Sequence, residues 1–465
     1  MHVSGQRHNG LIAFIFTLLG LACQLAFTVY KRFRLGIYEI PYTLSSEYPS
    51  EVWSAARMLE FAPVQRPQVT KSRLSKPADE ESSSMPRRIP QLDLARQYDG
   101  LGQEVHAALE RVCASQQFIL GPEVAALEQE IANYLAVNEV VGCASGTEAL
   151  WLGLLAVGVQ PGDLVATTPF SFFASASAIV RAGGRPIFVD VDPATLNVSL
   201  SLLEQRLLNG AAIRAAVPVH LYGQCVDMET LLRLSSQHKF AVVEDAAQAF
   251  GAEWTGRKAG AWGDAAAFSF YPTKNLSAYG DAGCVTTQDK ATADRMRRLR
   301  NHGGHDRYFH DEIGWNGRLD ALQAAVLRVK LKYLGEWNRA RHERARIYDQ
   351  LLAKSGLIAA SGGTQSPVRL LETAAGATHV YHQYVIRAAR RDQLRAFLAE
   401  CGVGTEIYYP LPLHLQKCFV YLGYRQGDFP EAERAASEVL ALPMFPELAA
   451  DEQQYVVDSI AEFYS

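Results

Sequence analysis

The sequence predicts an α/β fold, in which a large, mainly parallel sheet wrapped by helices is followed by a smaller α+β domain. From Ile89 onward, short β-branched runs alternate with helical segments, which is typical of a parallel sheet. A long amphipathic stretch, Arg318–Leu352, indicates a connecting helix or a helix pair. A Gly/Ser/Thr-rich break near Ser361–Gln365 then separates a smaller region that runs to Ser465.

The elements of the large sheet follow from these patterns. Helices are expected at segments such as Thr147–Ala156, Phe172–Ala182, Met228–Ser236 and Ala291–Asn301. We place the large domain at residues 86–335 and the small domain at 336–465, and no internal repeat is visible. The expected strands are Glu139–Cys143, Leu164–Thr168, Pro186–Val189, Ile213–Val219, Phe240–Glu244, Ala265–Phe270 and Gly283–Thr287.

Composition narrows the class of protein. With 48% apolar and 20% charged residues, the chain has the balance of a soluble globular enzyme. The formal net charge of −4 and the scattered basic residues argue against nucleic acid as a partner. The seven cysteines form no CxxC pair and no cluster with zinc-ligand spacing, so we expect free thiols and no metal site.

The N-terminal extension, residues 1–85, has a different character. Leu11–Tyr30 is an apolar run of about twenty residues, long enough to span a bilayer as a helix. Lys31, Arg32 and Arg34 follow it, so the positive-inside rule would put the rest of the chain in the cytoplasm. No convincing cleavage site ends the run, which argues against a removed secretory signal.

A flexible linker rich in Ser, Pro, Glu and basic residues extends from Tyr42 to Pro86. Within it, Met85 immediately precedes a stretch at which a self-sufficient catalytic chain could begin. Two interpretations therefore stay open for residues 1–84: a single membrane anchor, or an upstream extension that is never translated. We expect a cytoplasmic catalytic part, with a membrane partner only if the segment 11–30 is real.

Three motifs carry chemistry, and the first two are weak alone. Ser145-Gly146-Thr147 opens a predicted helix, where free backbone N–H groups can bind a phosphate, although an ordinary turn capped by Thr147 would look the same. Asp245 ends a predicted strand at the edge where α/β sheets bind ligands, although a helix N-cap aspartate would also fit. Such a buried carboxylate needs a cation nearby.

The third motif joins Ser269 at a strand end to Lys274 five residues later. A lone lysine in a loop is usually a solvated charge. Here aromatic residues and a Gly-rich segment surround it, so we expect partial burial, which lowers the pKa of a lysine and frees its amine to form a Schiff base. A phosphate cradle, an acid and then Ser-x-x-x-x-Lys is the order found in fold-type-I pyridoxal-phosphate enzymes.

Residues 88–465 resemble the DegT/StrS family of sugar aminotransferases along nearly their whole length. The resemblance implies the fold-type-I architecture and pyridoxal 5′-phosphate as cofactor. Many independent blocks in the right order carry it, and they are Ile89–Tyr98, Phe118–Glu123, Ser145–Leu150, Phe188–Ala194, Val219–Gln224, Glu244–Gly251, Ser269–Leu276, Asn316–Ala325 and Tyr409–Gln416.

Roles of individual residues follow from this resemblance. Lys274 resembles the Schiff-base lysine, and Asp245 the acid that keeps the pyridine nitrogen of the cofactor protonated. Phe172 matches the aromatic residue that stacks on the pyridine ring, although a core phenylalanine on a helix is the alternative. Gln248 is expected near the phenolic oxygen of the cofactor or near the incoming sugar.

The resemblance also assigns the phosphate site and the oligomeric state. Ser145, Gly146, Thr147 and Ser269 would hold the phosphate of the cofactor. Asn316 matches a residue that reaches the phosphate from the neighbouring subunit, which implies an obligate homodimer with shared active sites.

The implied reaction is a two-stage exchange. An amino donor, L-glutamate in most relatives, leaves its nitrogen on the cofactor, which passes it to a nucleotide-linked keto-sugar while Lys274 moves the proton. Tyr271–Leu276, Asn316–Asp320 and Gly427–Pro430 resemble the branch that aminates C-3 of dTDP-3-keto-6-deoxyhexoses. Some UDP-sugar aminotransferases are also similar.

Departures from the family pattern leave the sugar open. Ala282, Gly317 and Tyr408 stand where other residues are usual, and Gly317 and Tyr408 are expected near the substrate. Tyr409 and His414 are weaker candidates for substrate contact, with packing as the favoured alternative.

Three other functions share this fold or parts of this pattern. Related pyridoxamine-dependent sugar dehydratases carry histidine in place of the lysine, so the presence of Lys274 favours transamination. A cyclitol or aminobenzoate-type aminotransferase, and a non-catalytic membrane-tethered scaffold of the same fold, remain as alternatives.

Overall fold

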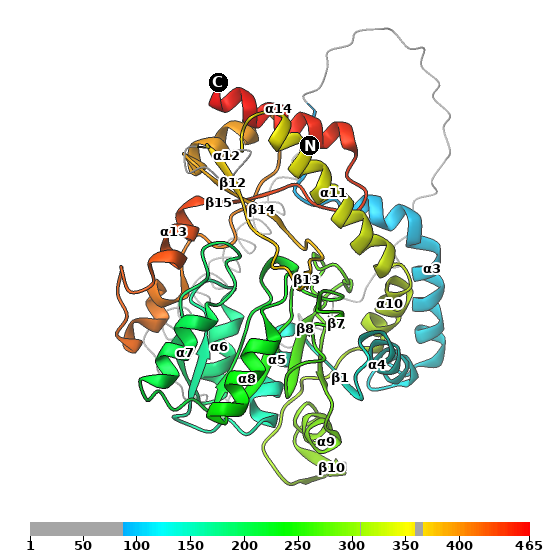
Figure 1. Cartoon of the computed structure of the whole chain (residues 1–465). Coiled ribbons are helices and arrows are strands. Elements are labelled where there is room, and N and C mark those ends of the chain that lie inside the picture. The colour runs from blue at the N-terminus through cyan, green and yellow to red at the C-terminus, as the bar shows by residue number, and fades with distance from the viewer. Residues whose placement is uncertain (1–86, 307, 359–365) are drawn as a thin grey trace, which may run out of the picture. The chain divides into compact units, whose positions relative to one another are not determined.

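The computed structural model describes residues 87–306, 308–358 and 366–465 (Figure 1). The predicted apolar segment 11–30, the linker and the break at 361–365 lie outside these residues. Within the described ranges, no helix is both long enough and apolar enough to cross a membrane. The six cysteines that the structure describes are free thiols.

A seven-stranded sheet forms the centre of the fold, in the order β3-β2-β4-β5-β8-β9-β1. All neighbouring strands run parallel except β9, which is antiparallel to both β8 and β1. The mainly parallel sheet is therefore confirmed. The strands are β1 (Glu139–Cys143), β2 (Leu164–Thr167), β3 (Arg185–Phe188), β4 (Ala215–Ala216), β5 (Ala241–Asp245), β8 (Ala265–Ser269) and β9 (Gly283–Thr287).

All seven strands lie where the sequence predicts them, but β4 is shorter than expected. The predicted strand 213–219 contracts to Ala215–Ala216. Pro218 has no N–H to donate, which interrupts the ladder at this point. Val219 nevertheless continues the pairing as an isolated bridge to Asp245, so the chain keeps its place in the sheet.

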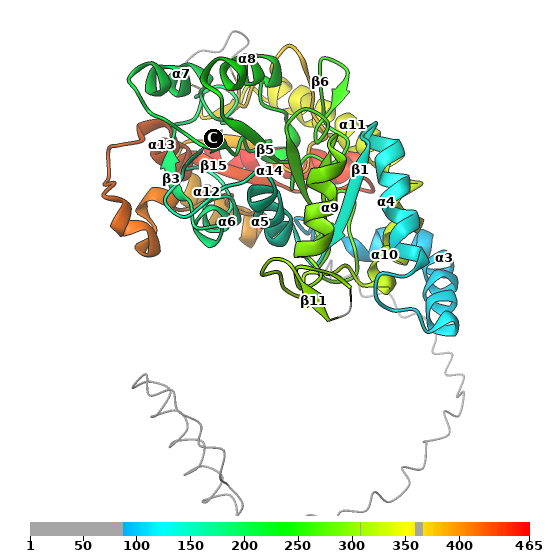
Figure 2. The ribbon, with the colours of Figure 1, turned by 90° about the horizontal axis from the view of Figure 1, so that it is seen from below.

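Helices cover both faces of this sheet, as the near-continuous apolar strands require. Neighbouring strand residues point into opposite cores: Val242 packs with one set of helices and Val243 with the other. Figure 2 shows α7 and α8 on one side of the strands and α5 and α6 on the other. The helices on the two faces are α3 (Leu94–Ser115), α4 (Pro122–Leu135), α7 (Leu200–Leu208), α8 (Met228–His238) and α10 (Ala321–Leu331), opposite α5 (Gly146–Ala156), α6 (Ala174–Arg181) and α9 (Lys290–Leu299).

The predicted helix pair over 318–352 is α10 and α11 (Leu334–Lys354). The second half of α11 packs with a three-stranded sheet in the order β12-β14-β15 and with α12 and α14, in a separate apolar core (Figure 1). Ile89 is fully buried in that same core. The elements of this core are β12 (Val368–Leu370), β14 (Tyr384–Ala388), β15 (Val439–Leu442), α12 (Arg391–Glu400) and α14 (Ala450–Tyr464), whereas α13 (Pro430–Glu438) packs in a different apolar core.

Short elements complete the described chain. The described residues also form a two-stranded sheet, β10-β11, a three-stranded sheet, β13-β6-β7, and three short 3₁₀ helices. They are β6 (Glu253–Trp254), β7 (Arg257–Lys258), β10 (Gly304–Asp306), β11 (Phe309–His310), β13 (Ala377–Thr378), η1 (Leu221–Gly223), η2 (Leu413–Leu415) and η3 (Lys417–Leu422).

Candidate active site

The carboxyl ends of several central strands carry the predicted site residues. Asp245 ends β5, and the loop with Lys274 follows β8. Because β5, β8 and β1 all run in the same direction, their following loops lie at one edge of the sheet. The segments around Lys274, Asp245 and Ser145 are thereby brought together from distant parts of the sequence.

Lys274 lies in a turn in which its backbone N–H donates to the carbonyl oxygen of Tyr271 (2.8 Å). Burial lowers the pKa of the Lys274 amine to about 8, and the nearby Asp245 carboxylate acts in the opposite direction. The partial burial predicted from the sequence is confirmed by its intermediate exposure. A lysine with this pKa is partly uncharged near neutral pH, which is the form that attacks a carbonyl group.

Asp245 is 5% exposed, and its carboxyl group interacts electrostatically with the amine of Lys274. Its Oδ2 accepts a hydrogen bond from the hydroxyl of Ser175 (2.7 Å), and its Oδ1 accepts one from the N–H of Ala247 (3.2 Å). Burial raises the pKa of this carboxyl group, while the Ser175 bond and the charge of Lys274 oppose the rise. No helix begins at Asp245, so the alternative of an N-cap aspartate is wrong.

The Ser145-Gly146-Thr147 segment opens α5 beside Ser269. Strand β9 holds the two together, because its Gly283 is paired with Cys143 on one side and with Ser269 on the other. The N-cap is Ser145, whose hydroxyl accepts the N–H of Glu148 (3.2 Å), and not Thr147. The N–H groups of the first turn of α5 and the hydroxyls of Ser145 and Ser269 therefore lie together, and we predict that they form the phosphate cradle.

At Gly146 the first turn of α5 lies in close contact with Ser269, and we expect Gly146→Ala to weaken phosphate binding. A Cβ added at Gly146 would lie 2.5 Å from the Cβ of Ser269, so one of the two segments would have to move. Overpacking of this kind costs about 1–3 kcal/mol, which corresponds to a 5- to 150-fold loss of cofactor affinity. Equilibrium titration with pyridoxal phosphate measures this loss.

A matched control is available in α11. A Cβ at Gly335 would meet nothing within 4 Å, so Gly335→Ala should leave the cofactor affinity unchanged. If Gly146→Ala binds as tightly as the Gly335→Ala control, the segment is not the phosphate cradle.

Phe172 and Tyr409 form an aromatic wall of the site. Phe172 precedes α6 and is 58% exposed, so the alternative of a core phenylalanine on a helix is wrong. Its ring centroid lies 6.2 Å from that of Tyr409. Gln248 donates from Nε2 to the Tyr409 hydroxyl (3.0 Å) and accepts the N–H of Tyr222 at Oε1 (2.7 Å). Proximity to Asp245 adds to burial in raising the pKa of Tyr409.

Asn316 is exposed and lies next to the strand that leads into the cradle, because the N–H of Ala144 donates to the carbonyl oxygen of Gly317 (3.0 Å). Gly317 is buried, and a Cβ there would lie 2.7 Å from Nε1 of Trp315. That indole N–H donates to Glu148 on α5. Packing of Trp315 therefore explains the glycine at 317.

The remaining predicted residues lie in the η2 region and just before it. Tyr408 is half-buried, and its carbonyl oxygen accepts a hydrogen bond from the Tyr222 hydroxyl. His414 is 1% exposed, with Nε2 bonded to Glu433 (3.0 Å) and its ring against Phe429. These contacts support the packing role for His414, whereas Tyr409 belongs to the site wall.

Several side chains of the site were not singled out from the sequence. Ser175 bonds Asp245, Tyr222 bonds both Gln248 and Tyr408, and Asn275 anchors the loop of Lys274. Asn275 and Tyr222 carried a signal, because they lie in the matching blocks Ser269–Leu276 and Val219–Gln224. Their contacts, and the contact of Ser175 with Asp245, become visible when segments far apart in the sequence meet.

The donor set fits pyridoxal phosphate. The cradle requires glycine at 146 and 283, because an added Cβ would lie 2.5 Å from Ser269 at Gly146 and 2.5 Å from Ser145 at Gly283. A buried carboxylate at Asp245 suits a protonated ring nitrogen, and an exposed ring face at Phe172 suits stacking. Lys274 supplies an amine with a lowered pKa.

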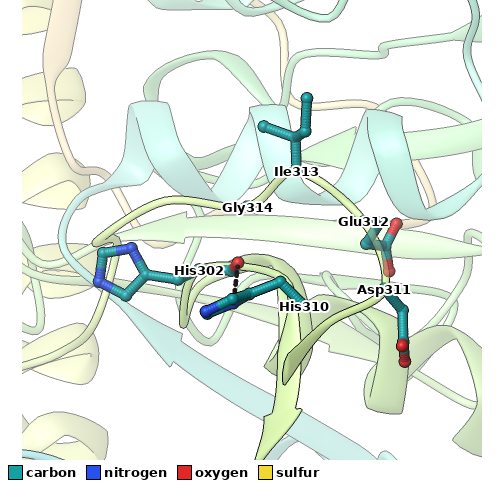
Figure 3. A pocket seen from close by; sticks show the side chains of 6 residues that line it. All are labelled: His302, His310, Asp311, Glu312, Ile313 and Gly314. Carbon is teal, nitrogen blue, oxygen red and sulfur yellow. Dashed lines mark hydrogen bonds between the residues drawn. The ribbon is translucent and has the colours of Figure 1, made fainter. Parts of the chain in front are cut away.

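A separate hollow of about 580 Å³ lies in the segment that leads to Asn316. Figure 3 shows His302 and His310 on one side of it and Asp311 and Glu312 on the other, with Nδ1 of His310 bonded to the carbonyl oxygen of His302 (2.9 Å). None of the residues lining it belongs to the loops around Lys274 of the same chain.

Comparison with known proteins agrees with this geometry. Residues 100–461 match the model of the DegT/DnrJ/EryC1/StrS aminotransferase family. The chain is 47% identical over 376 residues to a protein of Geobacillus stearothermophilus named "Pleiotropic regulatory protein", covering 81% of this chain and 98% of that one. It is 39% identical to the dTDP-3-amino-3,4,6-trideoxy-alpha-D-glucose transaminase of Streptomyces venezuelae, covering 81% and 96% of the two chains.

A solved structure supports the cofactor. The NtdA protein of Bacillus subtilis, solved with bound pyridoxamine phosphate, superposes with a TM-score of 0.74 at 29% identity. The match covers 82% of this chain and 86% of that chain.

Proposed function

The chain belongs to the DegT/DnrJ/EryC1/StrS aminotransferase family, and we infer that it is a pyridoxal-phosphate-dependent aminotransferase that acts on a nucleotide-linked keto-sugar. The observation that carries this inference is the pairing of Lys274, whose pKa is lowered, with the buried Asp245 beside the Gly146 cradle. When bound, the cofactor supplies a ring that accepts electrons from the carbon being aminated.

The proposal assigns each side chain a separate task. Lys274 holds the cofactor covalently, and once released its Nζ moves the proton between cofactor and sugar carbon. Asp245 keeps a proton on the ring nitrogen, and Ser175 orients that carboxylate. A cation at this position offsets the cost of burying Asp245, which otherwise raises its pKa.

The other contacts position the ring and its phosphate. Phe172 stacks on the ring, and Gln248, fixed by Tyr222, lies near the phenolic oxygen or the incoming sugar. Ser145, Gly146, Thr147 and Ser269 bind the phosphate through hydroxyls and N–H groups at the positive end of the α5 dipole.

The names of two relatives support the choice of substrate. We propose a dTDP-3-keto-6-deoxyhexose or a UDP-keto-sugar, with amination at C-3 and L-glutamate as the amino donor. Tyr408 and Tyr409 are the residues that we assign to contact with the sugar.

We also propose a homodimer with shared sites, in which Asn316 reaches the phosphate of the neighbouring subunit. Phe309 and Ile313, in the segment before it, are 73% and 96% exposed, as expected of side chains that a second copy covers. The catalytic part is proposed to work in the cytoplasm.

Addition of L-glutamate to the purified full-length protein tests the proposed function. We expect the absorption band of the lysine-bound cofactor to shift to that of the pyridoxamine form, with release of 2-oxoglutarate, and added keto-sugar to restore the first band. A folded protein that binds no cofactor after pyridoxal phosphate is supplied would contradict the proposal.

The name of the Geobacillus relative favours a second candidate, a regulatory protein that uses this fold without catalysis. Loss of Lys274, Asp245 or the Ser145-Gly146-Thr147 loop would favour that role, but all three are present. The same spectral experiment separates the two candidates. A cyclitol or aminobenzoate-type substrate would instead leave the glutamate step intact while the keto-sugar fails to restore the band.

A further inference from the structure

A hydrogen-bonded chain of side chains ties the residue after Lys274 to a remote part of the sequence. Asn275 is 5% exposed, and its Nδ2 donates to the carbonyl oxygen of Val380 (3.1 Å) and to Oδ1 of Asn338 (2.9 Å). Its Oδ1 lies 3.2 Å from Nδ1 of His382. The lysine loop is thus bonded to residues that are 63 to 107 positions away.

The orientation of the Asn275 amide fixes the state of His382. A backbone carbonyl can only accept, so Val380 holds the nitrogen of the amide and leaves Oδ1 to face the imidazole. Nδ1 of His382 must therefore carry the proton and donate it to Oδ1. Burial, reinforced by the charge of Lys274, keeps the pKa of His382 well below its usual value. The ring is therefore neutral, and it acts through the direction of its hydrogen bond and not through charge.

His382 is itself held rigidly. Nη1 of the buried Arg341 on α11 donates to the carbonyl oxygens of Tyr381 (3.2 Å), His382 (3.4 Å) and Met444 (3.1 Å). The N–H of Gln383 donates to the carbonyl oxygen of Tyr222 (3.4 Å), the residue whose own N–H donates to Gln248. An imidazole fixed in this way can impose a position on its partner.

We propose that His382 is a positioning residue for Lys274, acting through its hydrogen bond to Asn275. This inference rests on the proposed function, in which Lys274 must leave the cofactor and return to it in every cycle. The side chain moves in that cycle while the backbone at 274–275 has to stay in place. Misplacement of a reacting group by about 1 Å can cost on the order of 10²-fold in rate, so a rigid brace has a direct effect on the chemistry.

The test is the rate at which cofactor-depleted full-length protein captures added pyridoxal phosphate covalently, followed by absorption. H382F keeps the bulk of the ring without the donor, and we expect capture and kcat to slow about 10- to 100-fold with little change in KM. H382N offers an amide N–H at the place of Nδ1, and we expect it to recover rates within about threefold of the unmodified protein.

H379F is the matched control. His379 is three residues away and stacks on Tyr381, with a ring-centroid distance of 3.9 Å, and its Nδ1 accepts the N–H of Tyr381 (2.8 Å). Its replacement perturbs the same segment but leaves Asn275 untouched, so capture should not change. Equal capture rates for H382F and H379F, or an H382N protein as slow as H382F, would overturn the proposal.

A double-mutant cycle with N275A tests the route. If His382 acts through Asn275, H382F should cause no further slowing in the N275A protein, whereas independent, additive losses would overturn the proposal. If H382F fails to fold, H382A takes its place in the cycle, because it also lacks the donor at Nδ1. Absence of capture in the unmodified protein would instead refute the proposed function.

Discussion

Replacement of Lys274 by alanine is expected to abolish covalent attachment of pyridoxal phosphate and to lower kcat by at least about 10³-fold. Proton transfer by a positioned side chain alone contributes about 10²–10⁴-fold, and the variant also loses the covalent link. Lys274 is suited to both tasks because burial lowers the pKa of its amine to about 8. Borohydride reduction followed by peptide mapping shows whether the cofactor is attached and to which residue.

Lys330 provides the control that separates the effect of a lysine's position in the site from the effect of its burial. It is 2% exposed, burial lowers its pKa to about 8 as well, and its Nζ donates to the hydroxyl of Ser277 (2.9 Å). Its ammonium lies over the ring of Tyr279, and Asp245 is not among the groups that shift its pKa. Lys330→Met should therefore retain covalent cofactor and transamination. Attachment to Lys330, or a normal cofactor band in Lys274→Ala, would remove Lys274 from its role.

The order of the elements could be predicted because local patterns set it. All seven strands of the main sheet lie where apolar β-branched runs predict them, and α8 begins at Met228 as expected because Asp227 caps it. The carboxyl ends of parallel strands share one edge, so the sequence order of cradle, acid and lysine was enough to predict that these groups meet.

The contacts that refine the site depend on long-range packing that local patterns do not encode. Ser175 reaches Asp245 across 70 positions of the sequence, and the Tyr409 hydroxyl meets Gln248 across 161. Likewise, whether Phe172 faces the core or the site depends on where α6 begins, two residues later than predicted. Sequence reasoning therefore predicted the groups that we propose as reacting groups, but not the side chains that contact them.

The carboxylate of Asp245 should prove nearly as important as the lysine. Asp245→Asn preserves the size of the side chain but removes the charge that keeps the ring nitrogen protonated, so we expect the cofactor to bind while kcat falls about 10²–10³-fold, the cost typical of losing one preorganised electrostatic contact. Single-turnover rates of the glutamate half-reaction measure this loss without interference from the sugar.

Ser175→Ala separates the charge from its orientation. It removes the 2.7 Å bond to Oδ2 but leaves the carboxylate and its bond from Ala247 in place. A hydrogen bond to a charged group is worth about 1.5–3 kcal/mol, and because Asp245 keeps its charge and its bond from Ala247, we expect a loss at the lower end of that range, about 10-fold. If Asp245→Asn and Ser175→Ala slow the half-reaction equally, the charge of Asp245 has no special role, and protonation of the ring nitrogen must depend on another group. A much slower half-reaction in Asp245→Asn than in Ser175→Ala would show that the rate depends on the buried charge itself. The contribution of that charge to the rate would then explain why a carboxylate is buried at the end of β5 despite the unfavourable free energy of its burial.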